Sequence, residues 1–258
     1  MNKDQQAEQL GIFLCDYATT LLECGAATVR IEKNVGRMAE AYGCNAEVHI
    51  YPRHIDVVLS NVHEGRTAIR SKAIKGSGIN FSTVSALSKL SWNCLDRHMP
   101  LDIAERQYRC ITETARIPLP AVTLLTALAN ASFCRLFDGD RTAMAVVFTA
   151  TACGFYMKET LCRKFSIDIR IATIIAGCVS AIMSCSCYVF NIGTTPDIAL
   201  ATSVLYLIPG IPYLNAVSDL INGHHICAMS RLIHAVTMTV CLSAGLYIGL
   251  TLMDYCAK

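Results

Sequence analysis

Residues 169–190 read IRIATIIAGCVSAIMSCSCYVF, a run of 22 residues in which Arg170 carries the only charge. A helix of about 20 predominantly apolar residues is long enough to cross the hydrocarbon core of a bilayer. Residues 231–253 form a second run of this kind, charged only at Arg231. The two runs predict an integral membrane protein. Their length and low charge disfavour the alternative, in which they are buried helices of a soluble protein.

The chain after Pro118 holds three more stretches that are long or apolar enough to cross a membrane. The stretch near residues 142–161 is the weakest, because it is rich in Thr and Ala and ends at Lys158 and Glu159. The sequence therefore predicts about five transmembrane helices, near residues 118–137, 142–161, 169–190, 197–217 and 231–253.

The charged residues are unevenly distributed along the 258 residues of the chain. Residues 1–116 hold 14 Lys and Arg and 13 Asp and Glu, whereas residues 117–258 hold 8 and 7. This difference indicates that the two parts of the chain lie in different surroundings, water and lipid. It predicts a polar domain over residues 1–116 and a transmembrane domain over residues 117–258. The formal net charge of +2 is too small to favour a nucleic-acid partner.

The polar domain combines helical and strand periodicity. Between residues 45 and 61 apolar residues alternate with polar ones around a turn at Pro52, which predicts a β-hairpin, and residues 66–74 could add a third strand. Helical spacing is found over residues 10–22, 28–42, 84–95 and 101–115. The predicted fold class is an α-helical membrane protein with about five transmembrane helices, preceded by a small α+β cytosolic domain.

The connectors between the predicted spans indicate the orientation in the membrane. The connector after the second span is basic, whereas residues 138–141 and 191–197 are neutral to acidic. Because basic connectors stay in the cytoplasm, this connector and the N-terminal domain are expected inside, and five spans place the C-terminus outside. The first residues lack a basic region followed by an apolar core, so no signal peptide is expected.

The fourth predicted span is interrupted by Pro209, Gly210 and Pro212, which a regular helix cannot accommodate. A broken membrane helix needs protein or a water-filled cavity around its backbone groups, and transporters commonly bind substrate and ions there. Asn215 and Asp219 follow one helical turn apart. These five residues are predicted to frame a substrate-binding and permeation site. The alternatives are a simple proline kink and, for Asp219, a solvated position at the cytoplasmic boundary.

Asn130 in the first predicted span is a further candidate for a residue of the permeation site, although polar residues in membrane helices mostly serve packing. Arg170 and Arg231 would suit a carboxylate substrate, and anchoring at the cytoplasmic surface explains them equally well. The sequence shows no catalytic motif, no phosphate-binding loop, no cofactor site and no metal site. The 14 cysteines lack the spacing of a disulfide framework and are expected to be reduced thiols.

Two segments resemble the signatures of the threonine/serine exporter (ThrE-like) family. Residues 25–32, GAATVRIE, are similar to its G-A-x-T-x-R-x-E pattern, and residues 209–223, PGIPYLNAVSDLING, to its P-G-x-P-x-x-N-x-x-x-D-x-x-x-G pattern. The resemblance covers nearly the whole chain. Since full-length members carry more spans, it implies a split exporter, in which a small all-membrane partner subunit joins this chain to export succinate or a related dicarboxylate across the bacterial inner membrane.

The leading hypothesis is therefore an exporter subunit rather than an enzyme, with a cytoplasmic N-terminus and a periplasmic C-terminus. Gly25, Thr28, Arg30 and Glu32 would form a gate or a docking surface, unless Arg30 and Glu32 simply cap and solvate a helix. The alternatives are a subunit of a threonine/serine exporter, a membrane-anchored enzyme or sensor acting through residues 1–116, and a scaffold that only assembles its partner.

Overall fold

The computed structural model describes residues 3–61, 67–76, 78–114, 117–189 and 193–256. It divides the chain into two compact units. Unit 1 comprises Met1–Ala115 and Ile211–Leu232, and unit 2 comprises Arg116–Gly210 and Ile233–Lys258. Residues 211–232 thus belong to the same unit as the N-terminal residues. The division of the chain at residue 116, which the sequence predicts, assigns them to the transmembrane domain instead.

Unit 1 contains a three-stranded antiparallel sheet in the order β1-β2-β3. The strands are β1 (Cys44–Ile50), β2 (His54–Asn61) and β3 (Thr67–Ala73). The register pairs Val48 with Val57 and Ile50 with Ile55, so the alternating apolar residues face the same side. The predicted hairpin and its turn at Pro52 are confirmed. The predicted third strand is present over Thr67–Ala73, while residue 66 lies outside the described residues.

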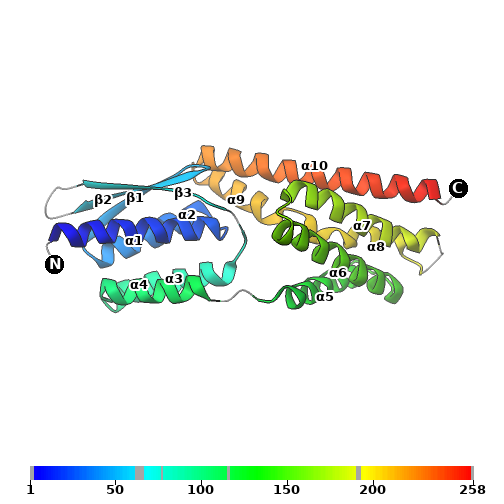
Figure 1. Cartoon of the computed structure of the whole chain (residues 1–258), viewed down its shortest axis with the longest axis horizontal. Helices are drawn as coiled ribbons and strands as arrows, with labels where there is room; N and C mark the ends of the chain where they lie inside the picture. The colour runs from blue at the N-terminus through cyan, green and yellow to red at the C-terminus, as the bar shows by residue number, and fades with distance from the viewer. Residues whose placement is uncertain (1–2, 62–66, 77, 115–116, 190–192, 257–258) are drawn as a thin grey trace. The chain divides into compact units, whose positions relative to one another are not determined.

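Two layers of helices cover one face of this sheet (Figure 1). The layer against the sheet is formed by α1 (Lys3–Glu23) and α2 (Thr28–Ala41), and the next by α3 (Phe81–Asp96) and α4 (Leu101–Glu113). Apolar side chains from the helices and the strands form one core around the fully buried Tyr17, whose hydroxyl donates to the carbonyl of Leu87 at 2.8 Å. Burial raises the pKa of Tyr17 above its usual range. The four helices agree with the predicted helical segments.

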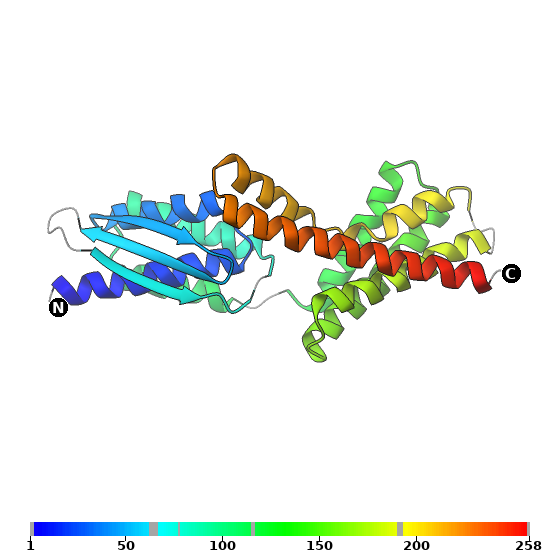
Figure 2. The same cartoon turned by 90° about the horizontal axis from the view of Figure 1, so that it is seen from above.

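Among the described residues of unit 1, no helix covers the other face of the sheet, as Figure 2 shows from above. Asn45, Glu47 and His49 of β1 are exposed on this face. Their alternation with the half-buried Ala46 and Val48 explains why the sequence of β1 reads polar at every second position.

Unit 2 consists of helices in the part of the chain that the structure describes. They are α5 (Leu119–Leu136), α6 (Arg141–Lys164), α7 (Ile169–Val189), the short α8 (Pro196–Ser203) and the 3-10 turn η1 (Leu205–Leu207). After α9 (Gly210–Ile221), the long α10 (His225–Cys256) gives its first residues to unit 1 and the rest to unit 2.

Three helices are long and apolar enough to cross a membrane: Leu119–Leu136, Ile169–Tyr188 and His225–Asp254. A fourth candidate is the pair Pro196–Leu207 and Gly210–Ile221, which is bent by 61° at the break. The protein is therefore a mostly helical membrane protein with three or four candidate spans, and the predicted count of about five is not confirmed.

The difference in count has two physical causes. The helix α6 carries polar threonines along its length and the charges Lys158, Glu159, Arg163 and Lys164 at its end, which lower its hydropathy. The predicted span over 197–217 is interrupted at Pro209, so it forms two helices instead of one. The predicted fifth span also begins earlier than expected, because α10 starts at His225 and not near residue 231.

Glycines bring α7 and α10 into close contact within unit 2. A Cβ added at Gly249 would lie 2.8 Å from the carbonyl oxygen of Cys178, and one at Gly245 would overlap the carbonyl of Ile174. The two glycines form a G-x-x-x-G sequence, which lets helix backbones approach closely in membranes.

We expect Gly245→Ala to lower the thermal midpoint of the purified protein in detergent, because overpacking typically costs about 1–3 kcal/mol. The matched control is Gly36→Ala in the middle of α2, where an added Cβ meets no atom within 4 Å. This control should raise stability by roughly 0.4–1 kcal/mol, because it reduces the entropy of the unfolded chain. Equal shifts for the two variants would contradict close packing at Gly245.

Candidate functional site

The turn between α1 and α2 exposes backbone carbonyl groups for recognition by side chains. Gly25 adopts φ +84°, a left-handed conformation that glycine accepts without steric cost. The N–H groups of Gly25 and Ala26 donate to the carbonyls of Leu22 and Leu21, which ends α1 in a glycine cap. The carbonyl oxygens of Gly25 and Ala26 therefore remain available to other parts of unit 1.

The break before α9 follows from Pro209 and Gly210, as the sequence predicts. Pro209 lies between η1 and α9, and the N–H of Gly210, the first residue of α9, bonds to the carbonyl of Ile208 at 2.9 Å. Pro212 lies in the first turn of α9, where a backbone N–H has no helical partner to lose. Asn215 and Asp219 then lie on one face of α9.

The two signature segments meet inside unit 1. The side-chain amide of Asn215 donates to the carbonyl of Gly25 at 3.1 Å. The guanidinium of Arg231, on α10, donates from Nη2 to the carbonyl of Ala26 at 3.1 Å. Asn215 is 190 residues from Gly25 in the chain, and Arg231 is 205 residues from Ala26. Both side chains thus bind the backbone of the same glycine turn and hold these distant segments together.

Asp219 forms a buried ion pair with Arg231 beneath this turn. The side chain of Asp219 has 0% exposure and that of Arg231 has 18%, and Arg231 Nε lies 3.3 Å from Asp219 Oδ2. Both carboxylate oxygens, Arg231 Nη1 and the Thr28 hydroxyl are buried without a hydrogen-bond partner. A buried charge is tolerated when it is paired, so Arg231 is what permits Asp219 to stay inside. The spare donors and acceptors give this ionic cluster unused capacity to bind a proton, water or a carboxylate.

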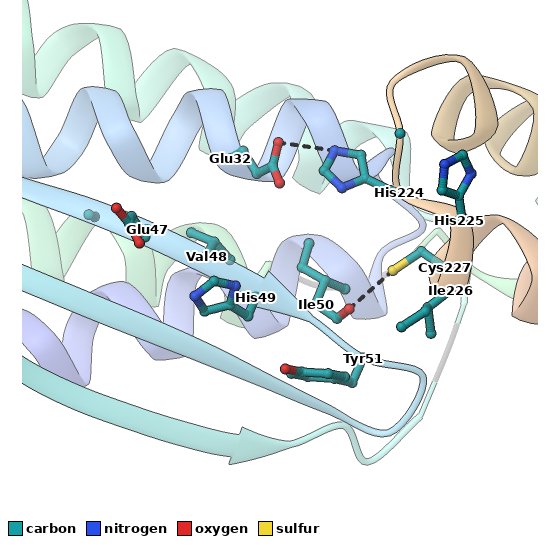
Figure 3. Close-up of a pocket in the computed structure, with 12 residues that line it drawn as sticks. Glu32, Glu47, Val48, His49, Ile50, Tyr51, His224, His225, Ile226 and Cys227 are labelled. Atoms are coloured by element: carbon teal, nitrogen blue, oxygen red, sulfur yellow. Dashed lines mark hydrogen bonds and ion pairs between the residues drawn. The ribbon is translucent and has the colours of Figure 1, made fainter.

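His224 links this cluster to the residues of the first signature. Its backbone N–H donates to the carbonyl of Asp219 at 2.8 Å, and its ring lies 3.3 Å from the carboxylate of Glu32. Figure 3 shows Glu32, on α2, and His224, in the turn between α9 and α10, turned toward one another. Arg30 is exposed on α2 and does not join the cluster. Of the four predicted motif residues, Gly25, Thr28 and Glu32 therefore lie at the meeting point.

Asn130 lies in unit 2, in a different polar cluster. Its amide donates to Thr151 Oγ1 at 3.1 Å, and Thr151 in turn lies 3.4 Å from the carbonyl of Ser203. The hydroxyls of Ser180, on α7, and Tyr206, on η1, lie 3.0 Å apart, and the Ser180 hydroxyl donates to the carbonyl of Ala150 on α6 at 3.4 Å. This neutral cluster is buried among α5, α6, α7, α8 and η1. Among the predicted permeation residues, Pro209 and Gly210 also belong to unit 2, whereas Pro212, Asn215 and Asp219 belong to unit 1.

Sequence reasoning did not find the pairing of Arg231 with Asp219 or the roles of Ser180 and Tyr206. The signal for the ion pair was present, because two opposite charges stand 12 positions apart in the charge-poor half of the chain. Serine and tyrosine in apolar helices carry no comparable signal, since most such residues serve packing. Within the residues that the structure describes, no group of three or more His, Cys, Asp or Glu side chains could hold a metal ion.

The chain belongs to the family described as "Putative threonine/serine exporter", whose model matches residues 13–253. It is 26% identical over 262 residues to "Probable succinate transporter subunit YjjP" of Klebsiella aerogenes, covering 98% of this chain and 97% of the relative. It is also 26% identical over 253 residues to the protein of the same name from Escherichia coli K12, covering 95% and 92%. No solved structure matches the chain. The protein is thus a membrane transporter of this family.

We expect Asp219→Ala to lower the stability of the purified protein by about 3–5 kcal/mol, because it leaves Arg231 partly buried without a counter-charge. The loss should fall at the lower end of that range, since Arg231 retains contact with solvent. The double variant Asp219→Ala/Arg231→Met should recover part of the loss, because it removes both charges. Thermal unfolding in detergent measures both effects.

Arg30→Ala is the control for this measurement, because Arg30 is an exposed member of the same motif. Its thermal midpoint should stay close to that of the native protein. A double variant that is no more stable than Asp219→Ala would contradict an energetic coupling between the two charges.

Proposed function

We propose that this chain is one subunit of an exporter in the bacterial inner membrane, which moves succinate or a related dicarboxylate out of the cytoplasm together with a small all-membrane YjjB-like subunit. The cargo and the existence of a partner rest on the names of the two relatives, which describe a subunit of a probable succinate transporter and are similar over nearly their whole length. The small, all-membrane, YjjB-like nature of the partner rests on the resemblance of the sequence to split members of the family. The observation that carries the role of the residues is the buried pair of Asp219 and Arg231 at the meeting of the two signature segments.

We further propose that unit 1 faces the cytoplasm and that α6 crosses the membrane with α5 and α7. The packing of α6 along both neighbours supports this, because each neighbour is itself a candidate span. Asp140, before α6, accepts hydrogen bonds from the backbone N–H groups of Ala143 and Thr194, which hold the pKa of Asp140 well below its usual range. Asp140 lies in the connector between α5 and α6, and Thr194 in the connector between α7 and α8. Their hydrogen bond supports a location of both connectors on the same side of the membrane, opposite the basic connector between α6 and α7. The N-terminus is then cytoplasmic and the C-terminus periplasmic.

The charges of the ionic cluster suit a carboxylate cargo. Carboxylic acids of ordinary pKa are ionised near neutral pH, so the substrate brings negative charge that needs a cationic partner. Arg231 can form paired hydrogen bonds with a carboxylate. Protonation of Asp219 would remove its negative charge and release Arg231 for the substrate, which would couple cargo to a proton. Pro209, Gly210 and Pro212 set the bend before this site, and Asn215 anchors it to Gly25.

The neutral cluster around Asn130 is the proposed permeation path in unit 2. Hydroxyl and amide groups can donate hydrogen bonds to a polar cargo and accept them from it. They do so without the large free-energy cost of placing a fixed charge in the membrane. A subunit of a threonine/serine exporter is the second candidate, favoured by the description of the matching family. Paired charges of both signs at Asp219 and Arg231 would also suit a zwitterion.

The experiment is efflux of succinate, with threonine in parallel, from cells that lack the endogenous exporter and express this chain with or without a candidate small partner. We expect succinate efflux to require both chains and to fall by roughly tenfold or more with Asp219→Asn, as for the loss of a charge in a transport site. Asp254→Asn is the matched control, because Asp254 is exposed on α10. Threonine efflux without succinate efflux would favour the second candidate. No efflux of either cargo from well-inserted protein would overturn the exporter proposal.

A further inference from the structure

Unit 1 contains an open groove that begins at Glu32 and His224, next to the ionic cluster, and continues along β1 beyond it. Its walls are Glu32 of α2, the strand β1 with the following Tyr51, and residues Gly223–Cys227, which comprise the end of the turn after α9 and the start of α10. Its volume is about 670 Å³ (Figure 3). The groove follows β1 along Ala46–Tyr51, so one whole wall is a strand edge.

The backbone of β1 presents hydrogen-bonding groups to this groove. In the sheet order β1-β2-β3, β1 is an edge strand, and among the strands that the structure describes it pairs with β2 alone. Tyr51 N–H donates to the carbonyl of His54 at 2.9 Å, so this pair is hydrogen-bonded. Because hydrogen-bonded pairs alternate along an antiparallel ladder, the N–H and C=O groups of Ala46, Val48 and Ile50 point away from β2. The Cys227 thiol, which donates to the carbonyl of Ile50 at 3.1 Å, agrees with this direction.

One end of the strand edge is therefore closed and the rest is open. Cys227 covers the carbonyl of Ile50, as Figure 3 shows, whereas the outward backbone groups of Ala46 and Val48 have no partner in the described part of the chain. An open strand edge is a template on which another extended chain can add as a strand. With a rise of roughly 3.3 Å per residue, this edge has room for a segment of about four residues.

We propose that the groove binds an extended basic segment of the partner membrane subunit, which adds to β1 as a further strand. The inference rests on the proposed function, which supplies a partner and places unit 1 in the cytoplasm. The carboxylates of Glu32 and Glu47 stand in the groove, and none of the described residues that line it is Lys or Arg. Glu47 is exposed and has no ion-pair partner among the described residues. The cytoplasmic segments of membrane proteins carry an excess of Lys and Arg, so a partner subunit offers the complementary charge.

A second copy of this chain fits the same edge less well. Antiparallel pairing of two β1 strands about Val48 would place Ala46 of the other copy against Ile50, where Cys227 already lies. A shorter segment that stops at Val48 avoids this overlap. In this register the strand edge therefore disfavours a second copy of the chain.

The test uses the full chain co-expressed with the candidate partner subunit and purified together in detergent. Ala46→Pro removes one outward N–H that the sheet does not use, and proline is tolerated on edge strands. We expect Ala46→Pro and Glu47→Lys each to lower the amount of co-purified partner by roughly tenfold, because strand addition relies on main-chain hydrogen bonds and on charge. A photo-reactive amino acid at position 47 should form a crosslink to the partner.

Ser71→Pro is the matched control on the opposite edge. The hydrogen bond from Ile74 N–H to the carbonyl of Arg53 shows by the same alternation that Ser71 N–H also points away from the sheet. This variant should keep its partner, and its thermal midpoint shows whether proline on an edge disturbs folding. Suppose that Ala46→Pro and Ser71→Pro retain equal amounts of partner while succinate efflux still requires both chains. This result would overturn the proposal that the partner binds in the groove, and it would leave the proposed exporter function standing. A crosslink from position 47 to a second copy, or none at all, would also overturn it.

Discussion

A carboxylate with no access to solvent imposes the strongest constraint on unit 1. Asp219 lies on α9 with 0% exposure, and an uncompensated charge there would destabilise the fold. Arg231 compensates it, but only because α10 turns back beside α9 after Gly223. The same guanidinium binds the carbonyl of Ala26, which is available because Gly25 ends α1 in a left-handed conformation. The ion pair, the glycine turn and the α9–α10 turn therefore depend on one another.

The two units handle polar groups in different ways. Unit 1 buries a charged pair, whereas the buried polar side chains of the described part of unit 2 are hydroxyls and amides such as Asn130, Thr151 and Ser180. Most of these hydroxyls bond to carbonyls of their own or neighbouring helices, which lowers the cost of placing them in a bilayer. Under the proposed function a transporter would gain from this division, because a charge can bind cargo or a proton strongly while a neutral path lets the cargo leave.

Much of the fold could be predicted from local patterns. The alternation of apolar and polar residues around Pro52 predicted the observed hairpin, and helical spacing predicted α1–α4. Both predictions were possible because each pattern reflects which face of one element is buried. The number of membrane spans was harder to predict. Hydropathy does not tell whether the threonine-rich α6 is held in a membrane by its neighbours, and Pro209 predicts a break but not its 61° angle. For the site, Asn215 and Asp219 could be nominated, whereas their contacts with Gly25 and Arg231 could not.

The sequence by itself determined the class of protein, the polar and apolar parts, the three strands, the break at Pro209 and the membership of the family. Those features depend on composition and on neighbours within a few turns or strands of the chain. Only the tertiary structure decided that α9 belongs to unit 1 from Ile211 onward, that Arg231 compensates Asp219, that Asn130 lies in a separate neutral cluster, and that one edge of β1 is open. For the long-range contacts the physical reason is distance along the chain: Arg231 and Ala26 stand 205 positions apart, and local periodicity carries no information about such partners. Asp219 and Arg231 are only 12 positions apart, but their pairing depends on the turn between α9 and α10, which periodicity does not fix.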